Sequence, residues 1–131
     1  MNTILAFTLL TAASASSATL DCDIRCKIQR ALNGDPTAAL AVAEESKKTQ
    51  THQVMVYWYQ IAAENGSPEG QDTYANILAS ESTEKDGCLR ALFWFEKAKQ
   101  GGNNHAATAE PKLKERIRHM DDFAMGCGGG L

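Results

Sequence analysis

The sequence lacks an excess of positive charge, an alternating strand pattern and a second domain's worth of residues. Its 131 residues contain 13 Lys and Arg against 16 Asp and Glu, a formal net charge of -3. Nucleic-acid binding usually needs a basic face, so we expect no nucleic-acid partner. No segment alternates apolar and polar residues as a half-buried strand does. The length suits one small domain and excludes a cofactor domain joined to a substrate domain.

Residues in metal-binding or catalytic patterns are also scarce. His52, His105 and His119 are scattered along the chain, and none belongs to a His-Glu-x-x-His motif. The four cysteines could form a zinc site, but Cys22 and Cys26 have no second closely spaced pair to complete it. We therefore expect no catalytic, metal-binding or cofactor-binding residues, and a protein that is not an enzyme.

The first 18 residues differ in composition from the rest. Ile4 to Ala13 form an apolar stretch, followed by the small-residue sites Ala13-Ser14-Ala15 and Ser16-Ser17-Ala18. This pattern predicts a signal peptide over residues 1–18, although it has no Lys or Arg before the apolar stretch. The stretch is shorter than the about 20 residues that a membrane span needs. We expect residues 19–131 to form a periplasmic or secreted domain without a membrane span.

Apolar residues recur at helical spacing through the rest of the chain, which predicts an all-α fold. Asp35-Pro36 and Ser67-Pro68 are typical helix starts, and glycines at Gly34, Gly66 and Gly102 are typical helix ends. Small residues lie four positions after each of these glycines, where they allow helices to approach closely. The predicted helices are 21–33, 36–49, 53–65, 68–80, 87–100 and 104–122.

The helices repeat in pairs. The aromatic pair Trp58-Tyr59 recurs 36 residues later as Trp94-Phe95. The helix-ending Gly34 likewise recurs 32 residues later as Gly66. Helical pairs at a nearly fixed period predict a solenoid. The segment 58–66 with Gly70-Gln71, and the segment 91–98 with Gly102, resemble the Sel1-like repeat, a relative of the tetratricopeptide repeat.

The resemblance implies a short α-α superhelical solenoid of antiparallel helix pairs. Repeats at about 36–66 and 68–102 would be flanked by helices 21–33 and 104–122. We expect the repeat core to contain Trp58, Tyr59, Ala62, Gly66, Trp94, Phe95, Ala98 and Gly102.

Sel1-like repeat proteins are mostly adaptors, so the resemblance implies binding of another, periplasmic or envelope, protein. Within this class the chain is similar to immunity proteins that neutralise toxic effectors in the periplasm. The alternative from another class is a cysteine-rich Sel1-like enzyme that binds or hydrolyses β-lactams. The residues expected to be exposed for a partner are Tyr74, Asn76, Gln71, Glu44 and His105.

Export favours disulfides over free thiols. The last helix should return its end to the level of Cys88, which brings the tail with Cys127 within reach. Closing this loop of about 40 residues should contribute about 3–4 kcal/mol. Cys22 and Cys26 would then form the second pair at a distorted first helical turn, because Cys88 lies about two repeats away from them.

Overall fold

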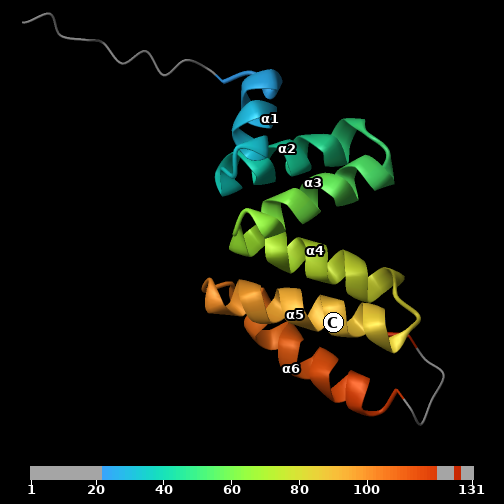
Figure 1. Cartoon of the computed structure of the whole chain (residues 1–131). Helices are drawn as coiled ribbons and strands as arrows, with labels where there is room; N and C mark the ends of the chain where they lie inside the picture. Colours follow the sequence, from blue (N-terminus) through green and yellow to red (C-terminus); the bar gives the residue numbers. More distant parts are fainter. Residues whose placement is uncertain (1–21, 121–125, 128–131) are drawn as a thin grey trace, which may run out of the picture.

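The protein is a stack of antiparallel helices in chain order (Figure 1). A computed structural model describes residues 22–120, 126 and 127. These residues contain no strand, and each helix packs against the next. The predicted all-α solenoid is therefore confirmed. The helices are α1 (Ile24–Leu32), α2 (Pro36–Thr49), α3 (His52–Glu64), α4 (Pro68–Glu81), α5 (Lys85–Gln100) and α6 (Asn104–Arg118).

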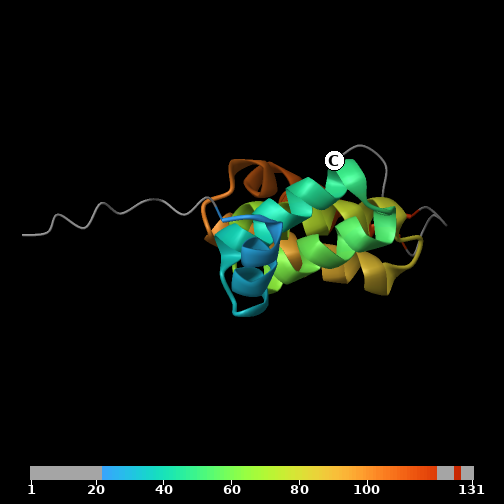
Figure 2. The same cartoon turned by 90° about the horizontal axis from the view of Figure 1, so that it is seen from above.

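The helices lie in two layers. Besides the contacts between consecutive helices, α1 contacts α3 and α2 contacts α4. Figure 2, which looks along the stack, shows α2 and α6 on one side and α1 and α5 on the other. We call the outer surface of α2, α4 and α6 the even face, and that of α1, α3 and α5 the odd face.

The helix ends differ from the expected ones mainly at α1, α5 and α6. α1 begins at Ile24 rather than at residue 21, because the Asp23 carboxylate caps it by accepting the Cys26 N–H at 2.9 Å. α5 begins at Lys85 rather than at residue 87. α6 ends at Arg118 rather than at residue 122, because the last turn tightens to bonds between residues three apart. The predicted signal peptide lies outside the described residues.

The same turn ends α1, α3 and α5. After α1, the N–H of Gly34 donates to the Ala31 carbonyl at 3.1 Å, and the N–H of Asp35 donates to the Arg30 carbonyl at 3.0 Å. Equivalent bonds follow α3 and α5, so all three are Schellman turns. Each turn requires a left-handed residue, which glycine provides without steric cost. The φ angles are 93° at Gly34, 92° at Gly66 and 88° at Gly102.

A capping side chain follows each of these glycines. Asp35, Ser67 and Asn103 each accept the backbone N–H three residues later, at 2.9, 3.0 and 2.9 Å. Pro36 and Pro68 occupy the first turns of α2 and α4, where no N–H is needed. The chain therefore reverses by the same turn and cap after α1, α3 and α5, which gives successive helix pairs the same orientation.

The core between the helices is made largely of small side chains. Alanines with at most 1% exposure occur on each of these helices, for example Ala31 of α1 and Ala39 of α2. At Gly70 of α4 a Cβ atom would lie 2.7 Å from the Cβ of Ala62 and 3.0 Å from its carbonyl carbon. Helices α3 and α4 thus approach to a distance that only glycine permits at this position.

Two of the four aromatic residues expected in the core are fully enclosed. Tyr59 is 1% and Phe95 is 0% exposed. Trp58 and Trp94 are half-buried and pack against the buried core clusters, so they lie at the edge of the core rather than at its centre. Consecutive helical residues point about 100° apart, and both members of each pair therefore cannot face the centre.

The close approach at Gly70 predicts that replacing this glycine by alanine, a change that normally stabilises a helix, destabilises the protein. Ala is favoured over Gly in a helix by about 1 kcal/mol. We nevertheless expect Gly70→Ala to lower the free energy of unfolding by about 1–3 kcal/mol, because it overpacks the contact with Ala62. Urea denaturation measures the change, with Thr73→Ala on the same helix as the control. A Gly70→Ala protein as stable as the wild type would show that the helices can separate there freely.

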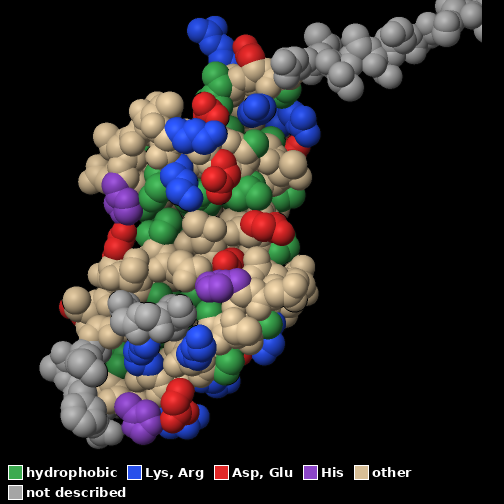
Figure 3. Space-filling model, turned by 180° about the vertical axis from the view of Figure 1, so that it is seen from behind, with side chains coloured by type: hydrophobic (Ala, Val, Ile, Leu, Met, Phe, Trp, Pro, Cys, Tyr) green, Lys and Arg blue, Asp and Glu red, His purple; other side chains and the backbone are tan. Residues whose placement is uncertain are grey.

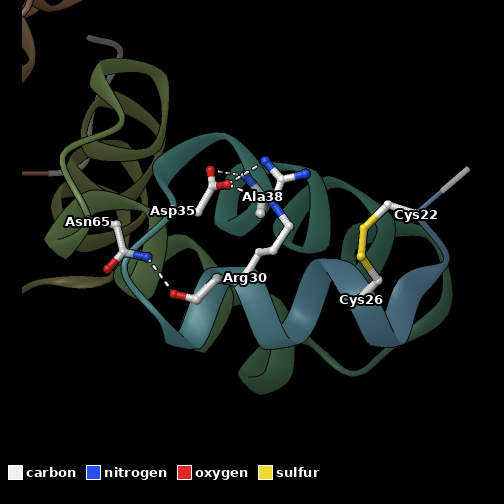
Figure 4. A network of polar contacts seen from close by, with 7 residues as sticks. Cys22, Cys26, Arg30, Asp35, Ala38 and Asn65 are labelled. Atoms are coloured by element: carbon white, nitrogen blue, oxygen red, sulfur yellow. Dashed lines mark hydrogen bonds and ion pairs between the residues drawn. A yellow bond between two sulfur atoms is a disulfide. The ribbon is translucent and has the colours of Figure 1, made fainter. Parts of the chain in front are cut away.

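An ion pair spans the corner between α1 and α2 (Figure 4). Arg30 donates to the Asp35 carboxylate from Nε at 2.8 Å and from Nη2 at 2.5 Å. The hydrogen bond from the Ala38 N–H and then the bond from Arg30 hold the pKa of Asp35 below its ordinary value of 3.8. At the same corner, Nδ2 of Asn65 donates to the Ala31 carbonyl at 2.7 Å and ties the end of α3 to α1.

The lowered pKa of Asp35 predicts that acid weakens this corner. Because the pKa is lower in the folded than in the unfolded state, the stabilisation is present above 3.8 and is lost as the pH falls through the folded-state value. We expect the free energy of unfolding to fall more below about pH 4 in the wild type than in Asp35→Asn, which does not titrate. Urea denaturation at a series of pH values measures this difference, and parallel profiles would contradict it.

Candidate functional site

The structure divides the five expected partner-binding residues into an exposed and a buried group. Glu44 of α2 and His105 of α6 are exposed, and Asn76 of α4 is half-exposed. Gln71 and Tyr74 of α4 are instead buried, at 8% and 4% exposure. The expectation that these two residues are available to a partner was therefore wrong.

Gln71 and Tyr74 are buried because they hold α4 to its neighbours. Nε2 of Gln71 donates to the Ala63 carbonyl at 3.1 Å, a second bond to an acceptor in the last turn of α3 that also accepts the Gly66 N–H. The Tyr74 ring packs edge-on against Trp94 of α5, with ring centroids 5.8 Å apart. Both roles depend on the rotation of α4 in the stack, which the repeat pattern alone did not specify.

The side chain of Glu44 is exposed but accepts a hydrogen bond from a buried residue. The buried Tyr59 of α3 donates its hydroxyl to the Glu44 carboxylate at 2.6 Å. Burial raises the pKa of Tyr59 far above its usual range, and the hydrogen bond and charge of Glu44 raise it further. The carboxylate thus has a preferred position on the even face that its own exposed side chain would not give it.

His105 of α6, in the same layer, is also held by a neighbouring side chain. Its Nδ1 lies 2.9 and 3.0 Å from the two carboxylate oxygens of Asp72 on α4. The Asp72 side chain is only 14% exposed, and its backbone carbonyl accepts Nδ2 of Asn76 at 2.9 Å. With Nδ1 engaged by Asp72, the other ring nitrogen, Nε2, is the one that can meet a partner.

All three histidines pair with a carboxylate. His52 lies 2.5 Å from Glu81, and His119 lies 3.0 Å from Glu115. Figure 3, which views the molecule from behind Figure 1 and so faces the even face, shows histidines close to acidic side chains. The sequence analysis expected His105 to be exposed but missed the partners Asp72 and Glu81, because they lie 33 and 29 residues from His105 and His52.

One motif with catalytic spacing went unnoticed in the sequence. Ser82-Thr83-Glu84-Lys85 has the Ser-x-x-Lys spacing found in enzymes that are acylated by β-lactams. Residues three apart share a face only within one helix. Ser82 is the C-cap of α4 and Lys85 is the first residue of α5, so the turn between the helices interrupts the motif.

The four cysteines form the two expected pairs. Cys88 at the start of α5 and Cys127 of the tail are joined, with Cα atoms 5.8 Å apart, and Nη1 of Arg116 donates to the Cys127 carbonyl at 2.6 Å. Cys22 and Cys26 are joined with Cα atoms 5.4 Å apart. This second bond does not distort α1, because Cys22 precedes the N-cap and is not helical. Two disulfides indicate a non-reducing environment.

Among the described residues, no three His, Cys, Asp or Glu side chains are grouped so that they could hold a metal ion. None of the helices in this part of the chain is long and apolar enough to cross a membrane. A comparison with known protein families, curated proteins and solved structures finds no match. The function must therefore be argued from the arrangement of the side chains.

The hydrogen bond between Tyr59 and Glu44 predicts a loss of stability in alkali. Because the pKa of Tyr59 is raised in the folded state, its stabilisation is present below the ordinary value of 10.0 and is lost as the pH rises above it. We expect Tyr59→Phe to lower the free energy of unfolding by about 0.5–1.5 kcal/mol at neutral pH. Above about pH 10, the stability of this variant should fall less steeply with pH than that of the wild type. Thermal unfolding measures both effects, and Tyr57→Phe, at an exposed tyrosine of the same helix, should show neither.

Proposed function

We propose that this chain is a Sel1-like repeat protein that is exported to the periplasm and binds a partner protein through its even face. The repeat geometry supports this assignment, because the same turn and cap join the helices at Gly34, Gly66 and Gly102. The two disulfides support an oxidising compartment. Solenoids of this kind present extended surfaces to other proteins, and their repeats carry no chemistry of their own.

The observation that carries the proposal is the fixing of exposed polar side chains on the even face. Tyr59 holds Glu44 at one end of the face, and Asp72 holds His105 at the other. Ordering a long polar side chain on binding costs about 0.5–1.5 kcal/mol. Side chains that are already ordered avoid this cost, so they are suited to recognition rather than only to solvation.

The charge of the middle of this face specifies the chemistry of the partner. Glu69, Asp72 and Asn76 share one side of α4 because they are three and four residues apart. The sequence contains no Lys or Arg between Thr49 and Glu84. Carboxylates therefore prevail there, and we expect the partner to contribute basic or hydrogen-bond-donating groups.

The array is short, so the partner must supply much of the interface. A stable interface buries about 800 Å² on each protein, which is a large share of one layer of three helices. The partner should therefore be a folded domain rather than a short peptide. Neutralisation of a toxic effector would be one form of this function, and the identity of the captured partner decides whether it applies.

The test compares substitutions on the two faces. We expect the wild type to capture one periplasmic protein at one-to-one stoichiometry. The triple variant Glu44→Gln, Asn76→Ala and His105→Gln should weaken the complex about tenfold or more, because a combined loss of about 1.4 kcal/mol over the three side chains already corresponds to a factor of ten. Titration calorimetry with the purified partner measures the dissociation constants, and circular dichroism checks that the variant folds.

The matched control places three substitutions on the odd face: Gln53→Ala, Tyr57→Ser and Glu96→Gln. All three residues are exposed, so their replacement should leave both the fold and the affinity unchanged. If the odd-face variant loses the partner while the even-face variant retains it, the binding face is wrong. If no stoichiometric partner is recovered, the binding function itself fails.

A further inference from the structure

The two disulfides differ in exposure and in what they join. Cys88 and Cys127 are both 0% exposed, and they connect α5 to the tail 39 residues later. Cys22 is half-exposed and Cys26 is exposed, and only 4 residues separate them in sequence. Figure 4 shows the second bond at the free end of α1, away from the contacts that hold this helix. Exposed disulfides are the ones that thiols can reach.

We propose that the Cys22–Cys26 disulfide is a thiol–disulfide exchange site that oxidises a protein dithiol. A thiolate of the dithiol attacks one sulfur, a mixed disulfide forms, and the Cys22–Cys26 bond breaks. The second thiolate of the dithiol then attacks the mixed disulfide and releases a new disulfide. Two electrons and two protons pass from the dithiol to Cys22 and Cys26, which end as thiols. This activity is separate from the proposed binding at the even face.

The charges around the two cysteines make Cys26 the leaving group. Cys26 lies in the first turn of α1, where the helix end favours a thiolate, and Arg25 and Lys27 flank it. The opposing charge is Asp23, whose carboxylate accepts the Cys26 N–H. Cys22 precedes the helix, with an aspartate on either side of it in the sequence. An incoming thiolate therefore attacks Cys22, because Cys26 leaves more readily.

The fold does not depend on this bond. α1 is held to the rest of the protein near its carboxyl end, through the buried Ala31, the Asn65 hydrogen bond to its carbonyl and the Arg30–Asp35 ion pair. These contacts lie one to two turns away from Cys26 (Figure 4). Reduction of the bond can therefore release both thiols while the six helices remain packed.

The experiment treats the oxidised protein with increasing dithiothreitol, alkylates the free thiols and identifies them by mass spectrometry. We expect Cys22 and Cys26 to be alkylated at a roughly tenfold lower reductant concentration than Cys88 and Cys127. Circular dichroism should show unchanged helix content at that point. Reduction of both disulfides together, or loss of helix content when Cys22 and Cys26 open, would overturn the proposal in favour of a purely structural bond.

A second measurement tests the direction of exchange. The oxidised protein is mixed with a reduced synthetic peptide that carries two cysteines, and we expect one peptide disulfide per protein. The variant Cys22→Ala with Cys26→Ala retains Cys88–Cys127 and should oxidise no peptide. Peptide oxidation by this variant, or none by the wild type, would refute the assigned site.

Charge variants test the role of Cys26 as leaving group. Arg25→Gln with Lys27→Gln should slow peptide oxidation roughly two- to threefold, because the Cys26 thiolate becomes a poorer leaving group. The control Arg90→Gln with Lys97→Gln removes the same charge from exposed positions of α5 and should leave the rate unchanged. Equal rates in both variants would contradict the proposed direction of attack.

Discussion

The architecture depends on the turn that closes α1, α3 and α5. A glycine in the left-handed conformation lets two backbone N–H groups return to the end of each helix, and the next side chain caps the helix that follows. No other residue type accepts that conformation at comparable cost. Since the same turn recurs at Gly34, Gly66 and Gly102, successive helix pairs are added in the same orientation. The solenoid is the geometrical result of this repetition.

The close stacking explains both the composition of the core and the position of polar groups. Helices that meet through alanine and Gly70 leave little room for large side chains at the centre. Tyr59 and Phe95 are the largest fully buried residues. The buried hydroxyl of Tyr59 donates to the exposed carboxylate of Glu44. The core of small side chains thus also contains the tyrosine that orders Glu44 on the even face.

The two ends of the short array are held in different ways. A solenoid has open ends, where the terminal helices lack a neighbour to pack against. At the carboxyl end, the enclosed Cys88–Cys127 bond joins Cys127 to α5. At the amino end, α1 is held by Arg30 and Asn65, and the Cys22–Cys26 bond remains at the surface. Structural need accounts for the first bond more fully than for the second.

The helical class and the turns could be predicted from the sequence, because glycine, proline and capping residues act over a few positions along the chain. The pairing of Cys88 with Cys127, 39 residues apart, followed only from the antiparallel order of the predicted helices. Tertiary structure decided which side of each helix faces a neighbour. Gln71 and Tyr74 are buried because α4 is rotated toward Ala63 and Trp94, and a repeat pattern with 32- and 36-residue spacings does not fix that rotation. Contacts such as the one between His105 and Asp72 join residues 33 positions apart, and only packing brings them together.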